Sequence, residues 1–256
     1  MAAAVDSYRQ TDFCEQTDFC EQSDPRLLRE VRTLTRFRDA RRIHQSWLAS
    51  GEKKLLLSMA ERTPAWIGPD HLTVLGFIAQ LLAGVCYAWS RWNRAALLLV
   101  IICLAVNWLG DSLDGTLARF RNQQRPRYGF YVDHMIDSFG SLSLMVGLAL
   151  SGFMHPVIAI TLLILFLLLS IQSYLATYTM GEFHISLWSF GPTELRVLLA
   201  VGNLALFWKP MVHIVGHGPH RLFDVGGAVG IAGMTLMIIA VTIKNTRRLY
   251  NEERLK

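Results

Sequence analysis

The chain has 256 residues, of which 52% are hydrophobic and 18% are charged, and its formal net charge is +5. This composition argues against two soluble domains and favours one membrane domain with a polar arm, because soluble domains rarely hold such long apolar runs. Much of the Lys and Arg lies before residue 63 or after residue 243, which indicates contact with anionic lipid headgroups and excludes nucleic acid as the expected partner.

The first 68 residues are expected to form a polar arm followed by an interfacial helix. Residues 1–45 are polar and charged and contain the hexapeptide TDFCEQ twice in succession, so we expect a disordered cytoplasmic arm with a sequence duplication. Residues 46–68 are basic and amphipathic and include Trp66, which is typical of a helix lying in the lipid headgroup region. An ordinary soluble helix is the alternative for this segment.

Residues 69–250 contain six apolar stretches, each about long enough to cross the ~30 Å hydrocarbon layer of a membrane. They cover roughly residues 72–90, 95–118, 131–152, 157–178, 194–208 and 225–243, and the fifth is short. We therefore expect an all-α integral membrane protein with about six transmembrane helices. Six crossings place the arm, the arginine-bearing loop at 119–128 and the basic tail on one side, so both termini are expected in the cytoplasm.

Four aspartates lie beside the most apolar segments, where a carboxylate costs at least ~2.5 kcal/mol at a helix centre. They are Asp111 and Asp114, near the end of the second stretch, and Asp133 and Asp137, at the start of the third. Two antiparallel helices, joined by a loop broken by Pro126 and Gly129, would bring the two pairs face to face. Such a set suits a pair of Mg²⁺ or Mn²⁺ ions, which bind oxygen ligands and offset the repulsion. The alternative is pairing with the loop arginines at the membrane surface, where ion pairs contribute little.

The spacing of these residues resembles a known family signature. The pattern is Asp111-x2-Asp114-Gly115-x2-Ala118-Arg119-x9-Gly129-x3-Asp133-x3-Asp137. It is similar to that of the CDP-alcohol phosphatidyltransferases (CDP-alcohol phosphotransferases), and the resemblance covers residues from about 50 to 250. It implies a phospholipid-synthesis transferase that moves a phosphatidyl group from CDP-diacylglycerol to an alcohol hydroxyl and releases CMP.

The same resemblance implies a role for each residue of the pattern. The four aspartates would hold two divalent ions, Mg²⁺ or Mn²⁺, and Asp137 would also take the proton from the attacking alcohol. Four further residues would line the nucleotide and its diphosphate: Gly115, Ala118, Arg119 and Gly129. In the stretch Pro69-Asp70-His71-Leu72-Thr73, Thr73 is expected to serve the cytidine site, whereas Asp70 replaces the Asn common in the family and either joins that site or caps the helix.

A second polar cluster opens the fifth apolar stretch. Glu194 and Arg196 stand at its start, where ionisable groups often face a water-filled cavity. They would line a pocket for the acceptor alcohol. The alternatives are that the two side chains form a structural pair, or that the arginine extends to the membrane interface. Two residues do not identify the alcohol.

The expected partners are a CDP-linked lipid or alcohol, membrane lipids and, because family members commonly pair through their spans, a second copy of the chain. The expected location is the bacterial inner membrane, with the active site facing the cytoplasm. The same residues would equally serve transfer of a phospho-alcohol from a CDP-linked polar alcohol to diacylglycerol. An ion-coupled transporter is the alternative of a different class, but the sequence lacks the internal symmetry that many transporters carry.

Overall fold

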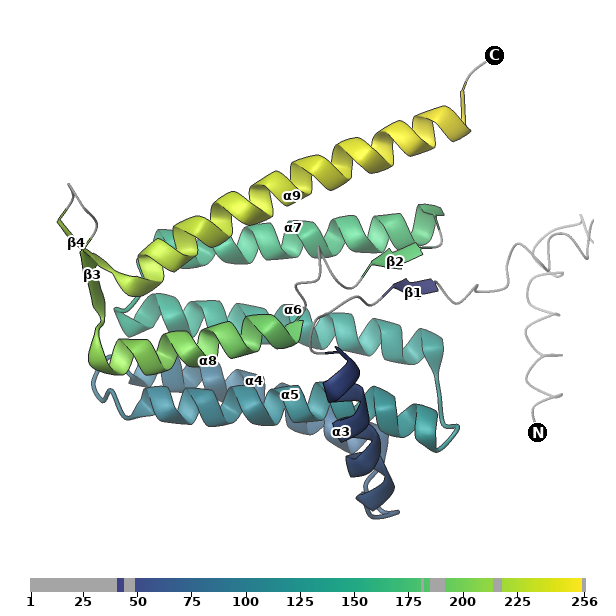
Figure 1. Ribbon diagram of the computed structural model, residues 1–256, viewed down its shortest axis with the longest axis horizontal. Coiled ribbons are helices and arrows are strands. Elements are labelled where there is room, and N and C mark those ends of the chain that lie inside the picture. Colours follow the sequence, from purple (N-terminus) through teal and green to yellow (C-terminus); the bar gives the residue numbers. More distant parts are fainter. Residues whose placement is uncertain (1–40, 44–48, 181, 185–191, 214–217, 255–256) are drawn as a thin grey trace, which may run out of the picture. The chain divides into compact units, whose positions relative to one another are not determined.

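Long helices make up most of the computed structural model, as the apolar stretches predict (Figure 1). The structure describes residues 41–43, 49–180, 182–184, 192–213 and 218–254. The helices are α3 (Ala49–Arg62), α4 (Pro69–Trp89), α5 (Ala96–Phe120), α6 (Pro126–Ser151), α7 (Pro156–Met180), α8 (Pro192–Trp208) and α9 (Leu222–Glu252). Strand β1 (Arg41–Ile43) pairs in parallel with β2 (Glu182–His184), and β3 (Met211–His213) pairs antiparallel with β4 (Pro219–Arg221).

Five of the described helices are long and apolar enough to cross a membrane: α4, α5, α6, α7 and α9. Helix α8 has 17 residues, of which Leu195–Trp208 form its apolar part. At about 1.5 Å per residue, α8 is somewhat shorter than the hydrocarbon layer is thick. The chain is therefore an all-α integral membrane protein, as predicted, while the sixth crossing stays a prediction.

The connection between α5 and α6 is shorter than the sequence indicated. Helix α5 runs on to Phe120 and α6 begins at Pro126, so only residues 121–125 separate them. The expectation that Pro126 and Gly129 break this loop is wrong, because both lie in the first turns of α6. Proline is well tolerated at a first helical position, where its missing N–H would have no partner. The chain turns instead at Asn122, whose φ is 54°.

Helix α4 packs against both α5 and α6, and small residues bring the three helices close together. A Cβ atom on Gly110 of α5 would lie 2.6 Å from the Leu72 carbonyl oxygen and 2.7 Å from the backbone of Gly76. A Cβ on Gly147 of α6 would collide with the carbonyl oxygen of Gly84. Helices in membranes use such small residues because close backbone approach increases van der Waals contact.

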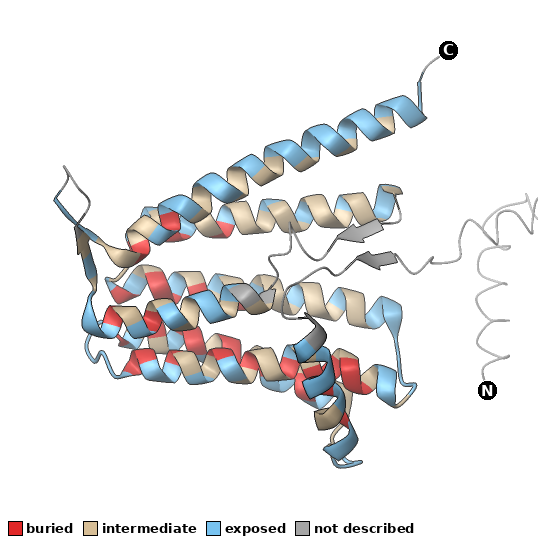
Figure 2. Cartoon of the chain, viewed as in Figure 1, coloured by how far each residue is buried: buried red, intermediate tan, exposed pale blue. Residues whose placement is uncertain are grey.

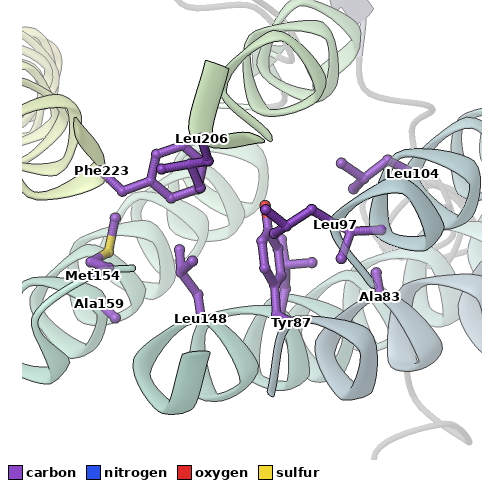
Figure 3. Packing of buried hydrophobic residues seen from close by; sticks show 11 residues of the cluster. Ala83, Tyr87, Leu97, Leu104, Leu148, Met154, Ala159, Leu206 and Phe223 are labelled. Carbon is purple, nitrogen blue, oxygen red and sulfur yellow. The ribbon is translucent and has the colours of Figure 1, made fainter. Parts of the chain in front are cut away.

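The main apolar core lies where α4, α5, α6 and α8 meet, and Ala159 of α7 and Phe223 of α9 extend it (Figures 2 and 3). Tyr87 of α4 is fully buried at its centre, beside Leu97, Leu148 and Leu206. The hydroxyl oxygen of Tyr87 accepts a 2.8 Å hydrogen bond from Nδ2 of Asn203 on α8. This bond supplies the partner that a buried phenol requires and ties α8 to α4.

Helix α3 packs on α5 through a second, smaller apolar cluster. Leu56 and Ala60 of α3 lie against Leu113 and Leu117 of α5, with Leu72 of α4 completing the cluster. The helix thus exists within the segment predicted to be amphipathic, and its buried side faces protein. Its position in the headgroup region stays a prediction.

The linker between α3 and α4 is fixed by a side chain from α5. Arg121, directly after α5, donates hydrogen bonds from Nη1 to the Ile67 carbonyl oxygen at 2.6 Å and from Nη2 to the carbonyl oxygens of Thr63 and Pro64 at 2.8 and 3.0 Å. A guanidinium can satisfy several carbonyls at once because its donors are held in one plane. The linker therefore stays against the end of α5 that carries the aspartates.

Candidate active site

The structure brings the aspartates of α5 and α6 to one site. Asp111 is exposed, Asp114 is buried, and Asp133 and Asp137 are half-buried. The charges of Asp111, Asp114 and Asp133 all act on the carboxyl group of Asp137, and the charges of Asp111 and Asp133 act on that of Asp114. The two pairs therefore share one electrostatic environment, although α5 and α6 pack mainly against α4 and have little direct contact with each other.

Asp111 forms an ion pair with Arg196 of α8. Arg196 Nη2 lies 2.7 Å from Asp111 Oδ2, and the exposed fractions of the two side chains are 14% and 39%. The guanidinium also acts on Asp137, so a single cation serves both sides of the site. Arg196 was expected to line an acceptor pocket; the structure pairs it with Asp111, and the acceptor pocket stays a prediction.

Asp114 is held by two hydrogen-bond donors. Thr73 of α4 donates from Oγ1 to Asp114 Oδ2 at 2.6 Å, and the Gly115 N–H donates to Asp114 Oδ1. The Thr73 hydroxyl also lies 3.2 Å from the Pro69 carbonyl oxygen, one turn earlier in α4. A buried carboxylate without such donors is costly, so Asp114 is most stable in the orientation that keeps both hydrogen bonds. Thr73 therefore fixes the orientation of the Asp114 carboxylate.

On α6, His134 lies between two of the aspartates in sequence but packs against aromatic rings. Its ring centroid is 4.2 Å from that of Phe130 and 4.8 Å from that of Tyr174 on α7. Nδ1 also contacts the Phe130 carbonyl oxygen of the preceding turn. His134 thus joins α6 to α7 behind Asp133 and Asp137.

The residues predicted to line the nucleotide lie on the last turns of α5 and the first turns of α6. Arg119 Nη2 lies 3.2 Å from Thr116 Oγ1, and its guanidinium covers Gly115, where a Cβ atom would lie 3.5 Å from Nη1. Ala118 is half-buried, and nothing lies within 4 Å of the position that a Cβ on Gly129 would take. The small residues therefore leave room beside the aspartates and within reach of a cation.

A surface pocket of about 440 Å³ lies where the start of α4 meets the α5–α6 connection, a volume typical of small-molecule sites. Its lining consists of Gly68, Pro69, Asp70, His71, Gln123, Gln124 and Arg125. Asp70 pairs with Arg125 across it, and this hydrogen bond raises the pKa of Arg125 above its usual value. The Arg125 guanidinium also lies 4.2 Å from the centroid of the Tyr128 ring.

Asp70 does not cap α4. The N-cap residue is Gly68, whose N–H donates a 3.0 Å hydrogen bond to Nδ1 of His71, and Asp70 follows in the first turn. A carboxylate in the first turn still interacts favourably with the helix dipole. Glu194 lies in the first turn of α8, but its side chain is outside the described residues.

The donor chemistry of the site fits divalent metal ions. Four carboxylates on two helices offer the hard oxygen ligands that Mg²⁺ and Mn²⁺ prefer. Within the described residues, no three His, Cys, Asp or Glu side chains converge closely enough to form a ready metal cage. Asp111 is turned to Arg196 and Asp114 to Thr73, so a metal ion would compete with these contacts.

Two features of the site could not be found from the sequence. The pairing of Arg196 with Asp111 joins residues 85 positions apart, and that of Arg125 with Asp70 joins residues 55 positions apart. Both cations were noted as charged residues near predicted span ends. Which carboxylate each one meets depends on how α8 and the α5–α6 connection pack.

Comparisons with known proteins match most of the chain to one family. Residues 66–243 match the family model for CDP-alcohol phosphatidyltransferases, a range that contains all the site residues named above. Archaetidylinositol phosphate synthase of Pyrococcus horikoshii is 37% identical to the chain over 86 residues. That alignment covers 34% of this chain and 43% of the relative, which is less than half of the relative's length.

Proposed function

The chain belongs to the CDP-alcohol phosphatidyltransferase family, and on that premise we propose that it transfers a phosphatidyl group from CDP-diacylglycerol to an alcohol. The alcohol oxygen attacks the phosphorus of the phosphatidyl group and forms a new P–O bond. The bond from that phosphorus to the oxygen bridging to CMP breaks, and CMP leaves. The observation that carries this proposal is the shared site of Asp111, Asp114, Asp133 and Asp137 on α5 and α6.

We assign the proton transfer to Asp137. Its carboxylate takes the proton from the alcohol hydroxyl as the oxygen attacks, which leaves the oxygen a better nucleophile. Asp137 lies beside the other three carboxylates and within the field of Arg196. The alcohol and the diphosphate have to meet at this position for the reaction to proceed.

The four aspartates would hold two divalent ions, Mg²⁺ or Mn²⁺, which when bound neutralise the diphosphate and the departing CMP. Without such cations, the carboxylates would repel an anionic substrate. Thr73 orients Asp114 for this role, and Arg196 balances the charge of Asp111.

The nucleotide end of the substrate would lie along the face formed by the last turns of α5 and the first turns of α6. Gly115, Ala118 and Gly129 leave room for the diphosphate to approach the backbone, and Arg119 supplies a guanidinium suited to phosphate oxygens. Thr73 and Asp70 connect this face to the pocket at the start of α4, where we place the cytidine.

The acceptor is tested first among charged alcohols, because Arg196 brings a cation to the site and the relative is named for making archaetidylinositol phosphate. Purified protein with Mn²⁺ and CDP-diacylglycerol is supplied in turn with inositol phosphate, glycerol phosphate and serine. CMP release that depends on one alcohol, with the matching lipid identified by mass spectrometry, is the expected result.

Two other results of this assay would change the assignment. CMP release only from CDP-choline or CDP-ethanolamine, with diacylglycerol as acceptor, would reverse the direction of transfer proposed here. No release with any donor would contradict the transferase assignment and return ion transport to consideration.

We also propose the membrane arrangement that the basic residues predict, with both termini and the active site on the cytoplasmic side of a bacterial inner membrane and the protein a homodimer. Residues 1–45 would form the arm, 46–68 the interfacial segment and 69–250 the catalytic domain. Labelling of single introduced cysteines at each end, in intact and permeabilised cells, tests the orientation. Native mass measurement in nanodiscs tests the dimer.

A further inference from the structure

Glu52 of α3 connects three helices through one carboxylate oxygen. Its Oε1 accepts hydrogen bonds from Nε1 of Trp108 at 2.8 Å and from Oγ of Ser112 at 3.2 Å, both on α5. The same oxygen accepts a bond from Oγ1 of Thr193 at 3.1 Å, in the first turn of α8. A half-buried carboxylate with three donors is well satisfied and holds its partners at fixed positions.

These contacts close a ring around the exposed end of the candidate active site. Ser112 directly follows Asp111 on α5, and Thr193 lies three residues before Arg196 on α8. Arg196 and Asp111 meet at 2.7 Å. The path therefore runs from Glu52 to Ser112 and Asp111, across the ion pair to Arg196, and back through Thr193 to Glu52.

The apolar face of α3 already accounts for its attachment to α5. Leu56 and Ala60 are buried against Leu113 and Leu117, and this burial needs no carboxylate. What Glu52 adds is a bond to α8, a helix that the apolar cluster does not include. A negative charge beside the first turn of α8 is also favourable to the helix dipole.

We infer that Glu52 is a positioning residue for phosphatidyl transfer, which holds the start of α8 so that the guanidinium of Arg196 stays at the site, beside the aspartates. This inference rests on the proposed function, because it takes Arg196 and Asp111 to lie at the reacting groups. The residue acts through Arg196 and does not touch substrate. Its loss would displace a guanidinium that the reaction requires in one place.

Three variants of the full chain separate position from charge. Glu52→Ala removes all three hydrogen bonds, whereas Glu52→Gln keeps an acceptor oxygen and removes the charge. Glu61→Ala is the matched control, since Glu61 is an exposed carboxylate on the same helix. CMP release with the active donor and acceptor is measured for each, together with hydrogen–deuterium exchange in the first turn of α8.

We expect kcat/KM to fall about tenfold or more in Glu52→Ala, mostly through the acceptor KM, and to stay within about twofold of wild type in Glu52→Gln and Glu61→Ala. Exchange at the start of α8 should rise in Glu52→Ala alone. In a double-mutant cycle, Glu52→Ala combined with Arg196→Ala should be no slower than Arg196→Ala by itself.

An active wild type with an unaffected Glu52→Ala variant would overturn this inference and leave the proposed function standing. If the losses of kcat/KM from Glu52→Ala and Arg196→Ala multiplied in the double mutant, the inference would be overturned too, because Glu52 would then act independently of Arg196. An equal loss of kcat/KM in Glu52→Gln would also overturn it, because the charge of Glu52 and not its hydrogen bonds would then be responsible. A wild type that releases no CMP would overturn the proposed function itself, and the exchange measurement would then test only the bond to α8.

Discussion

Thr73 and Asp114 are 41 residues apart in sequence, yet the Thr73 hydroxyl donates a 2.6 Å hydrogen bond to Asp114 Oδ2 across the α4–α5 interface. Asp114 is the buried member of the aspartate set, so its orientation depends on this donor. The contact links the start of α4, beside the surface pocket, to the carboxylates that we assign to metal binding.

Replacing Thr73 by Val should destabilise the protein by about 1–3 kcal/mol, because the shape is kept while Asp114 loses a donor. CMP release should fall as well. Thr73→Ser keeps the hydroxyl and is the control. Thermal unfolding in detergent and steady-state kinetics measure the two effects, and a Val variant as stable and active as wild type would contradict the role given to this bond.

Removing Arg196 should make Mn²⁺ bind more tightly while it slows transfer. Arg196 and a metal ion compete for Asp111, and a partly exposed pair of this kind contributes about 1 kcal/mol, or roughly fivefold in affinity. Electron paramagnetic resonance of free Mn²⁺ measures binding to Arg196→Ala without any need for turnover. The Mn²⁺ affinity of Arg196→Lys should lie between those of wild type and Arg196→Ala. An unchanged Mn²⁺ affinity in Arg196→Ala would mean that the ion pair does not compete with metal.

Asp111→Asn and Asp137→Asn should abolish transfer and leave the protein folded. Each change removes one carboxylate from the set while keeping the size of the side chain, so packing is preserved. Mn²⁺ binding should weaken in both variants, because a neutral amide is a poorer ligand than a carboxylate. Wild-type activity in either variant, measured as CMP release with the unfolding midpoint as the control for folding, would contradict the two-metal assignment.

Gly147→Ala should destabilise the helix bundle by about 1–3 kcal/mol, since the added methyl group meets the carbonyl of Gly84 and neither backbone can move away easily. Gly233→Ala on α9 is the matched control, because nothing lies within 4 Å of the position its Cβ would take. The control should be neutral or slightly stabilising, by at most about 1 kcal/mol. Unfolding in detergent compares them, and equal stability of the two variants would argue against close α4–α6 contact.

Hydropathy predicted the helices well and their ends less well. The stretch expected at 95–118 is α5 (Ala96–Phe120), whereas the stretch expected at 225–243 is α9 (Leu222–Glu252), which runs nine residues further. Apolar runs report the part of a helix inside the membrane, and a helix continues into water for as long as its residues favour it. Start signals such as Pro126 were interpreted as a break because proline both begins and interrupts helices.

In the candidate site, the sequence predicted relationships between residues on one helix but not contacts between helices. Spacing alone predicted that Asp111 and Asp114 share one face of α5 and that Asp133 and Asp137 share one face of α6, because helix geometry fixes those relationships. The partners of these carboxylates come from elsewhere, with Thr73 on α4 for Asp114 and Arg196 on α8 for Asp111. Their meeting depends on packing between helices, which a single sequence does not show.

The uneven packing of the helices also has a mechanical consequence. Helix α9 contacts the other described helices chiefly through α7 and is mostly exposed along its length, whereas α4 is in backbone contact with both α5 and α6 (Figures 1 and 2). Drawn out of a bilayer by its C-terminal end, the protein would release α9 first and at low force. Helices α4, α5 and α6 would be extracted later and together, so the aspartate site would still be assembled after α9 had left the bilayer.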